Sequence, residues 1–189
     1  MANSLAMQPD PVLAVIAAWT LGGVLLTAAR HKLKDRGAFT SVLSAYRLLP
    51  DWSLAVAVPV LILMEAGTAL ALFSAVLFPR IAPIAAGAAL GLLCCYTLAI
   101  AINLLRGRRS IDCGCGGEPT PLSAWMLLRN GVLIALAIIA GVLATSAVST
   151  GTLALAVPAV LLLWLVYAIA NQLLANQGVF HDRFGLSHG

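Results

Sequence analysis

Charged residues are scarce in this sequence, and their scarcity excludes a soluble globular protein. Only 10% of the 189 residues are charged, whereas 61% are hydrophobic, and the mean hydropathy is +1.00. An average soluble domain has about a quarter of its residues charged, because polar groups must cover much of its surface. The chain therefore needs a lipid bilayer as its solvent.

The sequence also lacks the alternation of apolar and polar residues that marks the strands of a membrane β-barrel. Its apolar stretches are instead continuous over about 20 residues, the length with which a helix crosses roughly 30 Å of hydrocarbon. Only helices satisfy the backbone of such spans in lipid. We predict an all-α membrane protein, a bundle of about five transmembrane helices. The expected spans are Val12–Ala29, Leu54–Phe78, Ile81–Leu105, Leu122–Leu143 and Thr152–Leu174.

Lys and Arg are absent ahead of the first apolar stretch, where Met1–Pro11 contains Asp10 as its only charged residue. A signal peptide would begin with a basic region, so we expect a true first span. Internal repeats and a second domain are also lacking. We assign residues 1–175 to a single transmembrane domain and 176–189 to a polar tail, whose two histidines are too few for a metal site.

Basic residues lie mainly in short loops beside helix ends, where they indicate topology rather than nucleic-acid binding. The loop between spans one and two and the loop between spans three and four contain Arg30, Lys32, Lys34, Arg36, Arg47, Arg106, Arg108 and Arg109. The positive-inside rule then predicts a multi-pass inner-membrane protein with both loops and the C-terminal tail in the cytoplasm and the N-terminus outside.

The first basic loop is too long for a simple turn. Its apolar residues recur at spacings of three or four, which predicts an amphipathic helix. These residues are Phe39, Val42, Leu43, Tyr46 and Leu49. Flanked by basic residues and ended by Pro50, the segment is expected to lie as an interfacial helix in the headgroup plane, and a purely structural role in covering the bundle is the simpler interpretation.

Two cysteines, Cys113 and Cys115, are separated by one glycine in the loop between spans three and four. Glycine permits the positive φ values and the close sulfur approach that a Cys-x-Cys disulfide requires. So small a ring is strained and easily reduced, which suits disulfide exchange better than structural cross-linking. The alternative is two inert small residues in a flexible loop. The charge-based topology places both thiols at the reducing face of the membrane.

Charged residues flank this pair on both sides. Arg106, Arg108 and Arg109 precede it, and nearby cations favour the thiolate, the form that attacks disulfides or binds soft metals. Asp112 and Glu118 oppose that effect. A second pair, Cys94 and Cys95, lies in the middle of span three and is expected to pack as small hydrophobes.

Glu65 lies near the middle of span two, where an unpaired carboxylate is costly. Arg129 in span four is within reach by the ordinary helical rise. We predict a Glu65–Arg129 pair or water-linked network, with Asn130 beside it and Asn103 low on span three. Polar contacts that merely hold the helices together are the alternative.

His31 and Lys32, at the end of span one, belong to the same end of the bundle as Arg129 and the cysteine loop. We take that end as the candidate site. His31 is interpreted as an interfacial residue, with a proton shuttle as the alternative that its ordinary pKa would allow.

A set of segments in a fixed order carries a family resemblance over roughly residues 25 to 140. The segments are Ala28–Asp35, Phe39, Tyr46–Pro50, Glu65, Arg106–Arg108, Asp112–Gly117 and Leu128–Asn130. With them, the sequence resembles the MauE branch of the MauE/DoxX group of redox-associated membrane proteins. The resemblance implies a multi-pass helical bundle that serves the maturation of methylamine dehydrogenase. It also implies a thioredoxin-like partner and the handling of disulfides in the small subunit of that enzyme.

These observations favour a membrane thiol–disulfide relay in which Cys113 and Cys115 alternate between dithiol and disulfide. Its partners would be a thioredoxin-like protein and a substrate protein with cysteines, and a quinone is the candidate electron acceptor. Two alternatives stay open. One is a soft-metal protein that passes ions from Cys94 or Cys95 to the loop, and the other is an inert assembly scaffold.

Overall fold

The computed structural model describes residues 10–108, 122–143 and 148–184. Within these ranges the chain forms α-helices and one short 3-10 turn, with no strand. Five of the helices are long and apolar enough to cross a membrane, which confirms the predicted fold class. They are α1 (Pro11–Lys34), α3 (Asp51–Ser74), α4 (Ala82–Leu105, preceded by the turn Pro79–Ile81), α5 (Ala124–Val142) and α6 (Thr150–Phe184).

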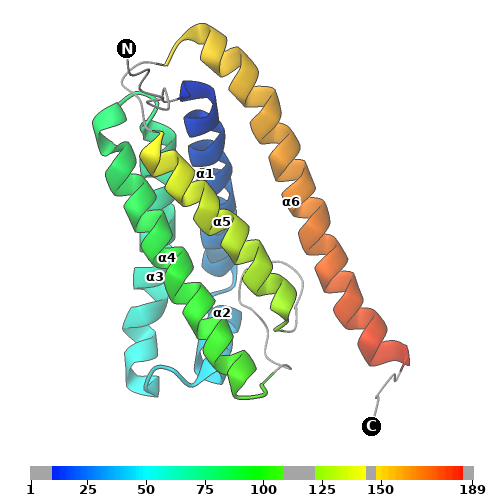
Figure 1. Cartoon of the computed structure of the whole chain (residues 1–189). Helices are drawn as coiled ribbons and strands as arrows, with labels where there is room; N and C mark the ends of the chain where they lie inside the picture. The colour runs from blue at the N-terminus through cyan, green and yellow to red at the C-terminus, as the bar shows by residue number, and fades with distance from the viewer. Residues whose placement is uncertain (1–9, 109–121, 144–147, 185–189) are drawn as a thin grey trace, which may run out of the picture.

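Helix α1 is the centre of the bundle. It packs against α3, α5 and α6, while α4 packs against α3 and α5 (Figure 1). In its most apolar window 56% of the residues are buried, compared with 11% in α6, so α6 is the peripheral span. Small residues let the central helices approach closely, as is usual when van der Waals packing replaces the hydrophobic effect in lipid. Those in the core include Ala17, Ala18, Ala69, Ala85, Ala86, Ala89, Ala137 and Ala140.

The end of α1 lies beyond the predicted Ala29. The helix continues to Lys34 and ends at Asp35. The carboxylate of Asp35 accepts a hydrogen bond of 2.8 Å from the amide of Ala38, so this residue begins the next helix instead of continuing α1. The apolar stretch ends at Ala29, five residues before the helix ends. The last turn of α1 therefore carries His31 and Lys32 as helical residues.

The predicted amphipathic helix between spans one and two is present as α2 (Arg36–Tyr46). Its inward face buries Phe39 and Tyr46 against the bundle, and it ends at Arg47, which adopts a left-handed conformation with a φ of 49°. Leu49 follows the helix instead of lying in it. Helix α2 marks one end of the bundle, called the α2 end below, where α1 and α4 finish and α3 and α5 begin (Figure 1).

Helix α6 is attached to α1 by an aromatic contact. The ring of Trp164 lies over Gly23, where an added Cβ would be only 2.2 Å from the ring, and its indole N–H donates to the carbonyl of Thr20 at 3.3 Å. Phe73 of α3 sits beside it in an edge-on arrangement. The helix then runs past the predicted Leu174 to Phe184, into the segment expected to be a polar tail.

Candidate functional site

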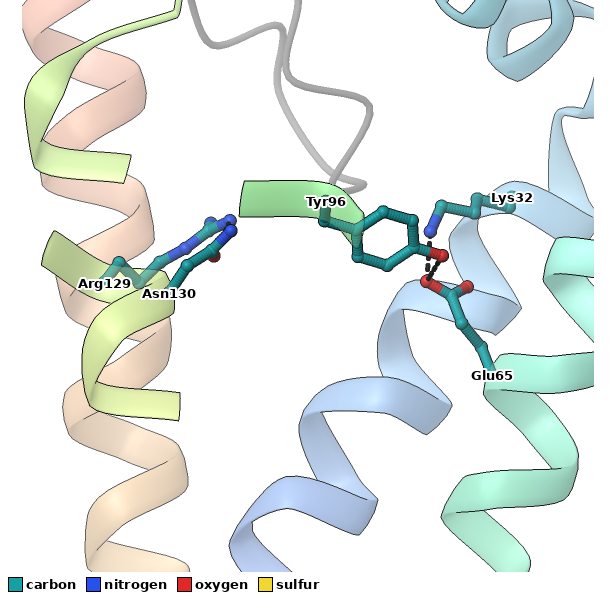
Figure 2. Close-up of polar contacts among 5 residues, drawn as sticks. All are labelled: Lys32, Glu65, Tyr96, Arg129 and Asn130. Atoms are coloured by element: carbon teal, nitrogen blue, oxygen red, sulfur yellow. Dashed lines mark hydrogen bonds and ion pairs between the residues drawn. The ribbon is translucent and has the colours of Figure 1, made fainter. Parts of the chain in front are cut away.

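A buried ion pair joins α1 to α3 near the α2 end. The ammonium of Lys32 contacts the Glu65 carboxylate at Oε1, and the two side chains are only 4% and 1% exposed. The hydroxyl of Tyr96 on α4 donates to the same oxygen at 2.7 Å. Three helices therefore meet at one carboxylate (Figure 2).

Two aromatic rings complete the surroundings of Lys32. Its ammonium lies 5.0 Å from the ring centre of Phe39 on α2 and 4.8 Å from that of Tyr96. Both distances allow cation–π attraction, which is strongest where water is excluded. Helix α2 thus covers the ion pair with Phe39, and the ammonium is stabilised by one carboxylate and two ring faces.

The direct pair predicted between Glu65 and Arg129 is wrong, because Glu65 pairs with Lys32 instead. Lys32 reaches Glu65 because α1 extends to Lys34 and packs directly against α3. Arg129 instead donates to Oδ1 of Asn171 at 3.1 Å and to Oδ1 of Asn130 at 3.4 Å. The expected neighbourhood of Arg129 and Asn130 is therefore correct, although its connection to Glu65 is not.

Arg129 and Asn130 belong to a second polar cluster. Asn130 also donates from Nδ2 to the hydroxyl of Thr97 at 3.3 Å, so this cluster links α4, α5 and α6. Thr97 follows Tyr96 on α4, and adjacent helical residues point about 100° apart. Helix α4 accordingly turns one residue to each cluster, and Figure 2 shows Arg129 and Asn130 on the opposite side of Tyr96 from Glu65.

Some buried polar atoms near these clusters lack a hydrogen-bond partner among the residues that the structure describes. Oε2 of Glu65 is one, which leaves the carboxylate satisfied on one oxygen only. Oδ1 of Asn103 is another, although the same side chain donates from Nδ2 to the carbonyl of Ala99 at 3.0 Å. Asn103 is fully buried low on α4, and its side chain bonds to its own helix instead of joining the predicted network.

The loop that carries Cys113, Cys115 and Arg109 lies outside the described residues. Its two ends can be placed. Helix α4 finishes at Leu105, and Ile100 on α4 packs in one cluster with Leu122 and Met126 on the far side of the loop and with Tyr46 of α2. The described residues on both sides of the cysteine segment therefore lie at the α2 end.

Cys94 and Cys95 were expected to pack in the core, but they do not. Both are free thiols with exposed side chains, because α4 turns neighbouring Leu92 and Leu93 inward instead. No group of three or more His, Cys, Asp or Glu side chains close enough to hold a metal ion occurs in the ranges that the structure describes. His31 is exposed and faces a cavity between α1 and α6.

Sequence reasoning missed Tyr96, Thr97 and Asn171. Their common feature is a hydrogen-bonding side chain inside an otherwise apolar span, the same signal that drew attention to Glu65. Asp35 was a signal for the Lys32 pairing. As the N-cap of α2 it separates two helices, so α1 can continue as far as Lys34 and Lys32 becomes part of its last turn.

Comparisons with known proteins agree with one another. The family model described as methylamine utilisation protein MauE matches residues 10–145. Proteins named methylamine utilization protein MauE from Paracoccus denitrificans and Paracoccus versutus are 42% and 40% identical, over 72% and 81% of this chain and 67% and 82% of their own length. The protein of that name from Methylophilus methylotrophus is 38% identical over 62% of this chain, and the match spans 60% of the relative. No solved structure matches the chain significantly.

Proposed function

The chain belongs to the family of methylamine utilisation protein MauE, and on that premise we propose that it is a membrane thiol–disulfide relay for the maturation of a partner enzyme. The relatives are named for methylamine utilisation. The resemblance points to the small subunit of methylamine dehydrogenase as the substrate class, delivered through a thioredoxin-like protein. The reactive groups are Cys113 and Cys115.

The relay is a cycle of two exchange steps. A thiolate of the partner attacks the Cys113–Cys115 disulfide and forms a mixed disulfide, and the second thiolate of the partner displaces it. The partner leaves oxidised, and the two loop cysteines are left as thiols. A two-electron acceptor, for which we propose a quinone, then takes two electrons and two protons as the loop disulfide forms again. Arg108 and Arg109 would favour the thiolate in both steps.

The observation that carries the proposal is the position of the two ends of the cysteine segment. Ile100, near the end of α4, and Leu122 and Met126, just after the cysteine segment, share one cluster with Tyr46 of α2, the helix that also covers the buried Lys32–Glu65 pair with Phe39. A charged pair inside a membrane protein is costly and is found mostly where function requires it. The segment with the proposed reactive thiols therefore starts and ends at the same end of the bundle as this buried pair.

The test replaces each loop cysteine separately. Cys113→Ser and Cys115→Ser should each abolish disulfide formation in the partner enzyme, and one of them should accumulate a mixed disulfide with the thioredoxin-like protein. Alkylation of free thiols followed by a mass-shift gel measures both outcomes. Cys94→Ala with Cys95→Ala is the matched control, since those thiols lie exposed on α4.

Normal maturation in both serine variants would contradict the relay. It would select the scaffold instead, in which the loop only docks a partner. Loss of maturation in the Cys94 and Cys95 control, with normal maturation in the loop variants, would contradict the assignment of the reactive pair.

A further inference from the structure

A cavity of about 410 Å³ lies between α1 and α6. This volume is in the range of sites that bind small organic molecules, and the lining is mostly apolar, as in such sites. Three aromatic rings contribute to it, and no Lys, Arg, Asp or Glu does. The lining residues are Gly23, Val24, Leu26, Thr27, Ala28, His31, Phe73, Trp164, Tyr167, Ala168 and Asn171.

The cavity has two unlike ends. The contact of Trp164 with Gly23 lies on its side away from the α2 end. From there α1 and α6 run in the same direction, and about two turns further along they present His31 and Asn171. One end of the cavity is therefore aromatic and the other is polar.

The amide of Asn171 is oriented by its neighbour. Arg129 donates to Oδ1 of Asn171 at 3.1 Å, and a guanidinium can only donate hydrogen bonds. The oxygen of the amide must therefore face Arg129, which leaves Nδ2 as a donor. His31 adds a ring nitrogen that donates or accepts according to its tautomer.

We propose that this cavity binds the ring of a membrane quinone, with a ring oxygen at His31 and Asn171 and the ring between the aromatic side chains. A quinone ring is flat and apolar with acceptor oxygens at opposite ends, which fits a hydrophobic cavity with donors at one end. A phospholipid headgroup fits poorly, because its phosphate is best bound by Arg or Lys and the lining has neither. The large exposed face of α6 leaves the hydrophobic tail in contact with lipid.

The inference rests on the proposed relay, which requires an acceptor for two electrons. In the complete step the thiols of Cys113 and Cys115 lose two electrons and two protons and form one S–S bond. The quinone gains both electrons and both protons and becomes the quinol. His31 lies one turn before α1 ends, at the α2 end where the cysteine segment starts and finishes.

The test measures binding apart from turnover, in the full chain carrying Cys113→Ser. A short-chain ubiquinone with a photoreactive azido group is cross-linked in lipid nanodiscs, and labelled peptides are identified by mass spectrometry. We expect labelling of α1 and α6. Ala168→Trp fills the cavity and should lower the labelling about tenfold or more, as expected if the dissociation constant of the probe rises about tenfold. Ala170→Trp is the matched control, because Ala170 is also exposed on α6 but does not line the cavity.

A second variant tests the polar end. Asn171→Leu removes the amide at similar volume and should lower the labelling, whereas Gln172→Leu, next to it and outside the lining, should not. Equal labelling of Ala168→Trp and Ala170→Trp would overturn the cavity as the quinone site. So would displacement of the probe by a short-chain phospholipid but not by unlabelled ubiquinone. Either result would still be compatible with the relay if the loop-cysteine variants block maturation. Normal maturation in those variants would contradict the relay, whatever the labelling shows.

Discussion

Lys32, in the last turn of α1, and Glu65, in the middle of α3, form an ion pair that is almost completely buried. The carboxylate also accepts a hydrogen bond from Tyr96, so the pair joins three spans and lies under α2. In lipid neither charge can find water when its partner is removed. The pair is therefore expected to control both the stability of the bundle and the packing of α2 against it.

The first prediction concerns single and double replacements of this pair. Lys32→Met or Glu65→Leu alone leaves a buried charge unpaired and should destabilise the protein by about 3–5 kcal/mol. The double variant replaces both charges by apolar groups and should recover most of that loss. Thermal unfolding in detergent, followed by size-exclusion chromatography, measures the difference.

The double variant also separates stability from function. If it is stable but fails to support partner maturation, the charges have a role beyond packing. Additive losses, with the double variant less stable than either single variant, would show that the two side chains do not form the pair.

Prediction from sequence succeeded for the spans and failed for the pairing, and the reason is physical. The length of an apolar run alone predicts a transmembrane helix, and all five were found. A span that is apolar on every side has no amphipathic face to reveal its neighbours. The periodicity therefore does not show which helix faces Glu65, and an apolar stretch that ends at Ala29 leaves Lys32 outside the first predicted span.

The candidate site was predictable to a similar extent. Lys32, Glu65, Arg129 and Asn130 all have polar contacts inside the bundle, because polar groups in spans must find partners. Their division into two clusters depends on the rotation of α4, which no local sequence signal specifies.

The second prediction tests this division with double-mutant cycles. Tyr96→Phe removes the hydroxyl that donates to Glu65 but keeps the ring over Lys32, so it should cost about 1–3 kcal/mol. Combined with Glu65→Gln, it should show a coupling energy of about 1 kcal/mol, as expected for residues in contact. The free energy of unfolding of the four proteins gives this value.

The control cycle pairs Glu65→Gln with Asn171→Leu, which alters the other cluster at Arg129. These two changes should add to within about 0.5 kcal/mol, because they share no partner. A large coupling in the control cycle would mean that one network spans both clusters, and our assignment of Glu65 would have to be withdrawn.

The third prediction concerns the attachment of α6. Gly23→Ala places a Cβ 2.2 Å from the ring of Trp164, so either the ring or α6 must move. Overpacking of this kind costs about 1–3 kcal/mol. Gly91→Ala on α4 is the control, since nothing lies within 4 Å of its Cβ position and stability should not fall. Trp164→Leu should partly rescue Gly23→Ala, and equal stability of the two glycine variants would argue against the contact.

The fourth prediction concerns orientation, which follows from charge. The basic residues of the loops predict that the α2 end faces the cytoplasm. In a variant with Cys94→Ala and Cys95→Ala, a membrane-impermeant maleimide should label Cys113 and Cys115 only after the membranes are opened. Intact spheroplasts should stay unlabelled, with and without prior reduction. The same variant gives the redox state of the loop, because thiols held as a disulfide react only after reductant is added.

The alternative outcome is equally informative about the relay. Labelling of intact spheroplasts only after reduction would place a disulfide on the outer side. That result would reverse the orientation derived from charge, and it would support the exchange chemistry, since disulfides persist in oxidising compartments. Labelling of opened membranes without reductant would support the orientation and show free thiols. The relay would then need its quinone step to form the disulfide against a reducing cytoplasm, so adding quinone to such membranes should protect both cysteines from the maleimide.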